Sequence, residues 1–262
     1  LLARTLCDAF SGATYFEYLL SRFTHPDELF GPVSIPGLKE EDYRRLTEGF
    51  LPTASVAFLD EIFKANSAIL NSLLTLVNER IFHHGRHRDA VPLLGVIGAS
   101  NELPDPDGGL GALYDRFLVR MSVPPIAGPV AFLAVATGEM PAPAVPEELR
   151  ISPDEIVELQ RVALAVQIPD DVRDALVALW QTGQRLEWAV SDRRWRQAVG
   201  FLRVAAAADG RTQLVPLDLL LLEAVLAPTP DQSGEVRQAL LEQLGTGAVP
   251  DHDLRAQWTL LA

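Results

Sequence analysis

The sequence predicts an α/β fold in which a mainly parallel sheet, flanked by helices, precedes an all-helical domain. Two apolar runs, at 56–59 and 93–99, have the length and composition of strands that are buried on both faces. Residues 151–228 instead place apolar side chains at helical spacing, and they follow a proline-rich stretch at 126–150. We therefore expect a sheet domain at 1–125, a proline-rich connection and then a helical domain.

The elements of the sheet domain are predicted from apolar periodicity and turn residues. The first helix should carry the single cysteine, Cys7, as a small core side chain. Paired Gly and Pro indicate an irregular insert at 24–52, and its charged tract at 39–45 is interpreted as a solvated loop. In chain order we expect a helix at 2–10, a strand at 14–20, the insert, a strand at 56–59, a helix at about 69–80, a hairpin around 83–90, and strands at 93–99 and 117–123.

The helical domain opens with capping signals. Ser152-Pro153-Asp154-Glu155 combines a cap residue, a proline at the first helical position and a glutamate placed for a capping box. Further helices are predicted from about 169, from Ser191 to about 208, and over 217–226. Residues 229–262 form a C-terminal extension with helical patterns at about 234–244 and 252–262, and the second pattern could begin a further domain.

Composition narrows the class of protein. The net charge of −13 and the pI near 4.8 oppose binding to nucleic acid, which depends on Lys and Arg neutralising phosphates. No stretch approaches the roughly 18 consecutive apolar residues of a membrane span, and no signal region opens the chain. One cysteine is compatible with a reducing compartment. We therefore expect a soluble, cytoplasmic protein.

Polar side chains follow two of the predicted buried strands. Asp60 and Glu61 come directly after the strand at 56–59, and Asn101 follows the strand at 93–99. Because the carboxyl ends of parallel strands meet at one edge of a sheet, these side chains should lie together where such sheets bind ligands. One acid can hold Mg²⁺ through water and its neighbour can polarise an attacking water, as in the Walker B arrangement. The alternative is that Asp60 only caps the segment that follows.

Arginines supply a second candidate set. Arg116 lies in Tyr114-Asp115-Arg116-Phe117, just before the predicted strand at 117–123. Ser191 is a good N-cap, which places Arg193 and Arg194 in the first turn of a helix, where free backbone N–H groups favour an anion. The alternative for this pair is two surface arginines beside Asp192.

Three histidines, His83, His84 and His87, could suggest zinc. No cysteine lies nearby, and Gly85 stands between them as at a hairpin tip. A solvated turn is therefore the preferred interpretation.

Together these motifs resemble MoxR-type AAA+ ATPases, and most closely the RavA-like subgroup. The resemblance spans roughly residues 1–228 and implies an AAA+ three-layer core followed by a helical lid domain. It is carried by FEYLLSRFTHPDELFGP (16–32), EGFLP (48–52), FLDEIFKA (58–65), LLTLVNERIF (73–82), ASNELP (99–104), ALYDRF (112–117) and SDRRW (191–195).

The resemblance implies ATP and Mg²⁺ as cofactors and gives each candidate residue a role. Lys64 departs from the arginine that many MoxR proteins carry at its position. By resemblance, Asp60 supports Mg²⁺ through water, Glu61 activates the attacking water, Asn101 positions that water, Arg193 contacts the γ-phosphate from the lid with Arg194 as the alternative, and Arg116 acts as a finger on the neighbouring subunit's nucleotide.

The resemblance also implies partners. MoxR proteins form rings, here expected to be a hexameric homo-oligomer, and they assist the maturation of client proteins, often alongside a protein with a von Willebrand factor A domain. The insert at 24–52 corresponds to the insert that faces the ring's pore. Two other hypotheses stay open: a non-hydrolytic scaffold that binds protein partners, and, as a distant third, a nucleic-acid remodelling ATPase.

One family motif is not found in these 262 residues. The phosphate-binding loop, GxxxxGK[ST], and the strand before it should precede the first helix, and that strand should lie between the strands at 93–99 and 117–123. Without it, the inner edges of the sheet would be left unpaired, which costs about 1–3 kcal/mol for each orphaned group. We therefore expect the native chain to carry both ahead of Leu1, and the 262-residue chain alone to hydrolyse negligible ATP.

Overall fold

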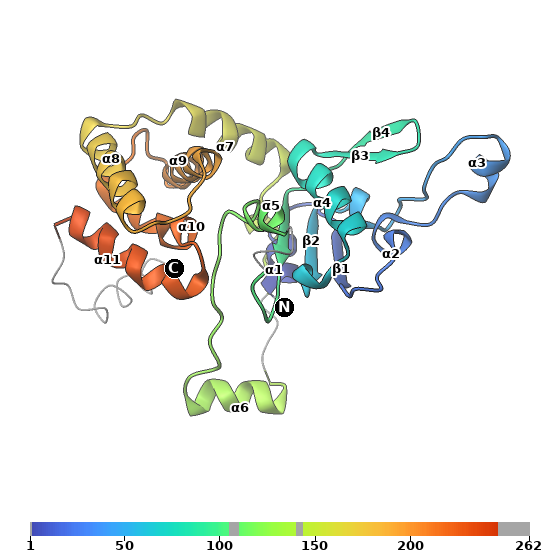
Figure 1. The fold of residues 1–262 in the computed structure, drawn as a ribbon, viewed down its shortest axis with the longest axis horizontal. Coiled ribbons are helices and arrows are strands. Elements are labelled where there is room, and N and C mark those ends of the chain that lie inside the picture. Colours follow the sequence, from blue (N-terminus) through green and yellow to red (C-terminus); the bar gives the residue numbers. More distant parts are fainter. Residues whose placement is uncertain (1, 105–109, 140–143, 246–262) are drawn as a thin grey trace. The chain divides into compact units, whose positions relative to one another are not determined.

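The computed structural model describes residues 2–104, 110–139 and 144–245 (Figure 1). Their contacts divide the chain into two compact units. The first comprises Leu1–Phe117 and Ala127–Asp154, and the second comprises Leu118–Ile126 and Glu155–Ala262. Residues 118–125, expected in the sheet domain, and residue 126 are therefore grouped with the helical unit.

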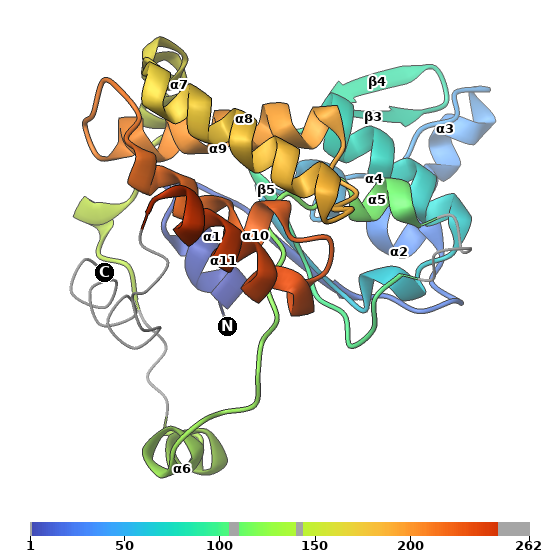
Figure 2. The same ribbon diagram turned by 60° about the vertical axis from the view of Figure 1, so that its left-hand side comes forward.

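A parallel sheet forms the centre of the first unit. Its strands are β1 (Tyr15–Leu19), β2 (Val56–Asp60) and β5 (Gly95–Gly98), in the order β1-β2-β5 with β2 in the middle. Strand β5 is labelled in Figure 2. Val56, Ala57 and Leu59 are buried, as expected for a strand covered on both faces. This parallel sheet and the helical second unit confirm the predicted fold class.

Helix α4 (Ser67–Glu79) covers the sheet with an apolar stripe. Ile69, Leu73 and Leu76 recur at helical spacing, and all three are buried in the same core as Leu59. The helix begins where the side chain of Asn66 accepts a hydrogen bond from the backbone N–H of Ile69 at 3.2 Å. The first helix, α1 (Leu2–Asp8), buries Cys7 as predicted, and burial raises the pKa of its thiol, so that the thiol stays protonated.

The insert at 24–52 is more ordered than predicted. It contains α2 (Pro26–Phe30) and α3 (Ile35–Lys39), and the 3-10 turn η1 (Leu51–Thr53) closes it. The prediction of an irregular insert was wrong for α2, whose Leu29 and Phe30 are buried in the core of the unit. It fails because spaced apolar residues inside a charged, Gly/Pro-rich stretch show no periodicity that a sequence pattern can register. Residues of α3 remain largely exposed.

A β-hairpin follows α4, at the predicted position. Strands β3 (Ile81–His84) and β4 (His87–Ala90) pair antiparallel, and Gly85 turns the chain with a φ of 64°. The prediction of a solvated turn was wrong for His84, whose residue is only 7% exposed. The rings of Phe30, Phe82, His84 and His87 follow one another with centroid separations of 5.3, 5.3 and 5.4 Å; the first two pairs are stacked, and the two histidines are tilted by 32°.

The strand predicted at 117–123 is not formed. Leu118–Ile126 is extended but gives its backbone hydrogen bonds to the second unit: the N–H of Arg120 donates to the carbonyl of Ala224 at 2.8 Å. The guanidinium of Arg120 also donates to the carbonyls of Ala227 and Pro228. Apolar composition predicts extended backbone, but a strand also needs a neighbouring strand to pair with.

The proline-rich connection contains a helix that composition did not predict. Helix α6 (Pro129–Thr137) starts with Gly128-Pro129 and ends at Gly138, and both glycines have positive φ values, 96° and 72°. A proline at the first position and a glycine after the last are ordinary helix boundary signals, so the sequence did carry the information. Apart from Thr137 its side chains are apolar, and none of its residues is buried. The short 3-10 turn η3 (Glu147–Leu149) follows before the second unit resumes.

The second unit is a helical bundle (Figures 1 and 2). Its first three helices start at or next to the predicted residues, whereas the expected fourth helix is a 3-10 segment followed by one short α-helical turn. The elements are α7 (Pro153–Ala165), α8 (Asp170–Arg185), α9 (Asp192–Ala208), η4 (Pro216–Leu222), α10 (Glu223–Leu226), η5 (Pro230–Gln232) and α11 (Ser233–Gln243).

One apolar core unites these helices. Leu179 of α8, Leu202 of α9 and Val225 of α10 are fully buried in it. Helix α11 contributes Val236 and Leu240 to the same core, so the described part of 229–245 packs within this unit. The helix predicted at 252–262 lies outside the described residues. Among the residues that the structure describes, no helix is long and apolar enough to cross a membrane.

Candidate active site

The acid pair lies at the carboxyl end of the central strand. Asp60 is the last residue of β2, and its carboxylate Oδ1 accepts the backbone N–H of Glu61 at 2.9 Å. Glu61 has φ 51° and ψ 42°, in the left-handed region, which costs a non-glycine residue about 1–2 kcal/mol. Backbone strain of this kind at the end of a central strand is typical of functional positions.

Hydrogen bonds beyond the strands bring Asn101 to the acid pair. The N–H of Ala99 donates to the carbonyl of Leu59, and the N–H of Ile62 donates to the carbonyl of Ala99, both at 3.0 Å. The segments that leave β2 and β5 therefore stay side by side. The side-chain Nδ2 of Asn101 donates to Oε1 of Glu61 at 3.1 Å. The structure thus places together the three residues predicted to meet at this edge: Asp60, Glu61 and Asn101.

A fourth side chain at this edge was given no catalytic role by sequence reasoning. Lys64 Nζ lies 3.1 Å from Glu61 Oε1, so the ammonium and the Asn101 amide meet the same oxygen. The other oxygen, Oε2, is buried and has no hydrogen-bond partner among the described residues. The Glu61 side chain is 14% exposed. The only available signal was the three-residue spacing of Glu61 and Lys64, which predicts an ion pair in a helical turn.

Arg116 is held within the first unit. Its Nε donates to Oδ1 of Asn78 on α4 at 2.7 Å, and its Nη1 lies 3.8 Å from a carboxylate oxygen of Asp115. The side chain is 22% exposed, so part of it reaches solvent. The guanidinium is therefore oriented by its own chain yet remains partly accessible from outside.

The two candidate arginines of the second unit have different environments. Arg194 is 1% exposed; its Nε donates to the carbonyl of Val225 at 2.6 Å and its Nη2 to the carbonyl of Leu118 at 2.5 Å. Arg194 is thus committed to the core of this unit, and its role as the alternative nucleotide contact stays a prediction. Arg193 is exposed. Successive helical residues point about 100° apart, so one residue decides between core and surface.

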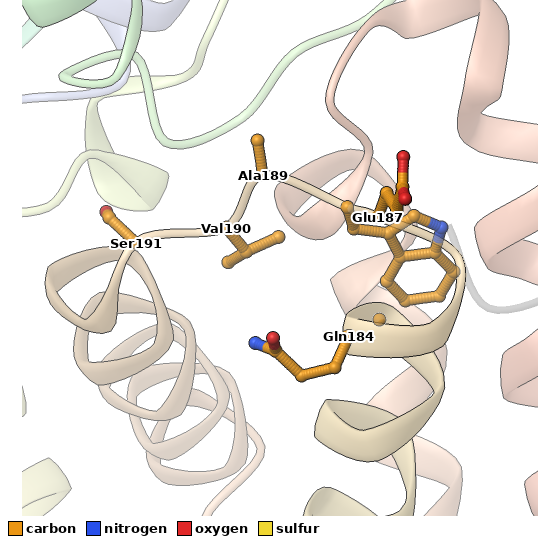
Figure 3. Close-up of a pocket in the computed structure, with 7 residues that line it drawn as sticks. Gln184, Glu187, Ala189, Val190 and Ser191 are labelled. Carbon is orange, nitrogen blue, oxygen red and sulfur yellow. The ribbon is translucent and has the colours of Figure 1, made fainter.

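The start of α9 has the predicted cap. Ser191 Oγ accepts the backbone N–H of Arg194 at 3.2 Å. Ser191 also borders a hollow of about 430 Å³ in the second unit, between the end of α8 and the start of α9 (Figure 3). Gln184 and Val190 extend into this space in Figure 3. The hollow is lined by Gly183, Gln184, Glu187, Trp188, Ala189, Val190 and Ser191.

The chemistry of the edge residues fits Mg²⁺ in a particular way. Carboxylate and amide oxygens, as in Asp60, Glu61 and Asn101, are the hard ligands that Mg²⁺ prefers. In the described ranges no three His, Cys, Asp or Glu side chains are placed to enclose a metal. The residues therefore fit an ion that is held by one or two carboxylates, water and a substrate phosphate, rather than an ion in a cage of protein ligands.

A parallel sheet with an acid pair and an amide at its carboxyl edge, joined to a helical lid, defines the AAA+ class of nucleotide-binding proteins. Comparison with known families supports this class. Residues 1–161 match the family model described as the MoxR domain in the MoxR-vWA-beta-propeller ternary systems, and residues 171–240 match an AAA lid domain. The chain belongs to the MoxR-type AAA+ ATPases.

Individual relatives are similar to this chain over much of its length. Two uncharacterized proteins of Methanocaldococcus jannaschii are 40% and 41% identical over 84% and 81% of this chain. The chain spans 58% and 55% of their lengths. A structural protein of Acidianus two-tailed virus is 31% identical over 56% of this chain and 25% of its own length.

A solved structure shares the fold. The crystal structure of a candidate ATPase from Cytophaga hutchinsonii superposes with a TM-score of 0.68 and covers 93% of this chain and 79% of its own. Its identity to this chain is 14%, so this likeness shows the fold alone.

Proposed function

We propose that this chain is part of an ATP-hydrolysing ring subunit that uses the energy of hydrolysis to remodel or mature partner proteins. The observation that carries the proposal is the hydrogen bond from Asn101 Nδ2 to Glu61 Oε1 at the carboxyl edge of β2. It joins residues 40 positions apart in the sequence at the place where parallel sheets bind ligands. A protein with only a structural role needs neither the strained Glu61 nor the amide beside it.

The edge residues support a division of roles. Bound ATP with Mg²⁺ supplies the phosphoanhydride bond that water cleaves. Asp60, fixed by its hydrogen bond to the Glu61 backbone, would hold the hydrated ion. Glu61 would take the proton of the attacking water on Oε2, the oxygen that has no partner among the described residues. Asn101 orients Glu61 through Oε1 and would also position that water.

Two arginines would complete the site from elsewhere. Arg116, partly exposed and oriented by Asn78, would act as a finger on the neighbouring subunit's nucleotide, where it stabilises charge in the transition state. Arg193, exposed in the first turn of α9, would contact the γ-phosphate from the lid. Both roles require assembly or domain closure, which makes a homo-oligomeric, hexameric ring part of the proposal.

The partners are proposed from the family. The matching model is named for systems that combine MoxR, vWA and beta-propeller proteins, which supports a von Willebrand factor A domain protein as a partner and chaperone-like action on protein clients. The RavA-like subgroup and a cytoplasmic location rest on the sequence resemblance and composition. The exposed helix α3 within the insert is the surface proposed for partner contact.

The test is phosphate release by the full-length natural protein, measured against its concentration. A finger in trans makes specific activity rise as subunits assemble. Glu61→Gln should abolish turnover while ATP binding and ring assembly persist, because the amide fills the same space but cannot take the proton. Glu79→Gln, at the exposed end of α4, is the control and should keep full activity. Unchanged phosphate release by Glu61→Gln would remove Glu61 from this role.

A non-hydrolytic scaffold that keeps the AAA+ shape is the second candidate. It is favoured if the full-length protein binds ATP and partners but releases no phosphate at any concentration. A nucleic-acid remodelling ATPase is opposed by the net charge of −13. Stimulation of ATP hydrolysis by DNA or RNA would favour the nucleic-acid remodelling ATPase over the other candidates.

A further inference from the structure

We infer that Lys64 is a positioning residue for hydrolysis: its ammonium holds the Glu61 carboxylate so that Oε1 is occupied and Oε2 is left for the attacking water. This inference rests on the proposed function, since it assigns to Lys64 the orientation of the group that would act as general base. Lys64 is not expected to touch the nucleotide itself.

The carboxylate of Glu61 is held from one side only. Lys64 Nζ and Asn101 Nδ2 both lie 3.1 Å from Oε1, whereas the buried Oε2 has no partner among the described residues. A carboxylate oxygen can accept about two hydrogen bonds, so these two donors saturate Oε1. An unpaired buried oxygen is unfavourable, and it therefore persists only where the surrounding structure fixes it. The pair of donors supplies that restraint.

The backbone of Lys64 is rigidly placed. It ends the 3-10 turn η2 (Ile62–Lys64), and its N–H donates to the carbonyl of Glu61 at 2.8 Å. Ile62, the first residue of the turn, and Ala65, which follows it, are buried. The left-handed conformation of Glu61 turns the chain out of β2 and starts this turn. The strained backbone of Glu61 therefore brings the two side chains of the ion pair close together.

A second ion pair in the chain shows what this arrangement adds. Glu158 and Arg161 on α7 also stand three residues apart, but their side chains are 58% and 71% exposed. Exposed pairs of this kind contribute little to stability because solvent screens them. In the pair at the sheet edge, Lys64 is 43% exposed but its partner Glu61 is only 14% exposed and shares its oxygen with Asn101. The two ion pairs thus have the same spacing, but only the pair at the sheet edge contains a nearly buried carboxylate that a second donor also holds.

Removing Lys64 should release one of the two restraints. The Glu61 carboxylate could then rotate about its terminal bond, with only the exposed Asn101 to hold it. Displacement of a reacting group by about 1 Å can cost about 100-fold in rate. With Asn101 still present, we expect a loss of about tenfold in kcat and a KM for ATP within about twofold of the wild type, because Lys64 acts on the chemical step and not on binding.

The kinetic test compares three variants of the full-length natural protein. Lys64→Met removes the charge at nearly constant length and should show the tenfold loss in kcat. Lys64→Arg restores a cation at the same place and should recover most of it. Arg161→Met breaks the exposed pair on α7 and should leave kcat unchanged. A normal kcat in Lys64→Met, or a weakened affinity for ATP with an unchanged kcat, would overturn the inference.

A second readout needs no hydrolysis. The side-chain amide of Asn101, observed by NMR in nucleotide-free protein with ¹⁵N-labelled asparagine, reports on its hydrogen bond to Glu61. Lys64→Met should shift these resonances, Lys64→Arg should return them, and Arg161→Met should not move them. Unmoved resonances in Lys64→Met would refute the restraint. If the wild-type protein hydrolyses no ATP, the proposed function is wrong. If the wild type hydrolyses ATP and Lys64→Met has the same kcat, only the inference about Lys64 is wrong.

Discussion

The backbone N–H of Arg45 donates to Nδ1 of His84 at 3.0 Å, and this hydrogen bond joins the insert to the β3–β4 hairpin. Because Nδ1 accepts, the proton of the neutral ring is on Nε2, which faces Asp89 Oδ2 at 2.7 Å. His84 thus links two segments that sequence reasoning treated as separate solvated loops.

Replacing His84 should loosen the insert. His84→Phe keeps an aromatic ring in the stack between Phe82 and His87 but leaves the Arg45 N–H without its acceptor. A lost partner costs about 1–3 kcal/mol, so protection of the Arg45 amide against hydrogen exchange should fall about tenfold or more. His83→Phe, at the exposed neighbouring position, is the matched control. Equal protection in the wild type and in His84→Phe would contradict the link.

A second contact between the same segments should depend on pH. His87 Nε2 lies 2.7 Å from Asp42 Oδ1, and this hydrogen bond lowers the pKa of Asp42. A carboxyl with a lowered pKa stabilises the fold above its unfolded pKa, about 3.9, and loses this contribution as pH falls through the folded value. The contact should therefore hold at neutral pH and fail only below about pH 4.

A ¹³C NMR titration of the Asp42 carboxyl measures this directly. In the wild type the midpoint should lie below the ordinary value for aspartate. In His87→Phe, which keeps an aromatic ring but donates no hydrogen bond, it should move up toward that value. His83→Phe should leave it unchanged. Identical midpoints in the wild type and His87→Phe would show that His87 does not hold Asp42.

Gly85 should resist any side chain. Its φ is +64°, and an added Cβ would lie 2.0 Å from the backbone oxygen of Tyr43, so both the turn and the insert would have to shift. We expect Gly85→Ala to lower the free energy of unfolding of the first unit by about 3 kcal/mol. Gly12 has a similar φ, +68°, but no atom lies within 4 Å of the added carbon. Gly12→Ala should lower the free energy of unfolding by only about 1–2 kcal/mol. Urea titration of both variants measures these losses, and equal losses would refute the close approach at Gly85.

The sheet edge was predictable from sequence because one rule fixes it. Parallel strands end at a common edge, so two apolar runs followed by polar residues were enough to bring Asn101 to Glu61. The start of α9 was likewise encoded in a single capping residue, Ser191. These predictions needed only local sequence signals and the common direction of the strands in a parallel sheet.

The rest depended on tertiary context that local patterns do not contain. The burial of Arg194 rather than Arg193 follows from the rotation of α9 against its core. The pairing of Lys64 with Glu61 follows from the left-handed conformation of Glu61. Glutamate has no intrinsic preference for that conformation, so the sequence does not predict it. The segment at 118–126 forms its backbone hydrogen bonds with the helical unit. A sequence pattern does not specify the hydrogen-bond partner of an extended segment.

Arg116 provides the sharpest test of the proposed ring. Arg116→Ala should lower kcat of the full-length protein about 10³-fold or more, as expected for a finger that stabilises the transition state. If the finger acts in trans, an Arg116→Ala subunit keeps an intact Glu61 and lacks only its neighbour's arginine. Mixing Arg116→Ala with Glu61→Gln subunits should therefore restore activity, because the second subunit lends Arg116 to the first.

The control for this mixing experiment is a chain that carries both substitutions. Glu61→Gln mixed with the double variant Glu61→Gln/Arg116→Ala contains no intact Glu61 and should stay inactive at every ratio. Asn78→Ala, which removes the acceptor of Arg116 Nε, should lower the activity of the unmixed ring by less than Arg116→Ala, because the guanidinium loses orientation but keeps its charge. An inactive mixture of Arg116→Ala and Glu61→Gln, with assembly intact, would mean that Arg116 serves its own subunit.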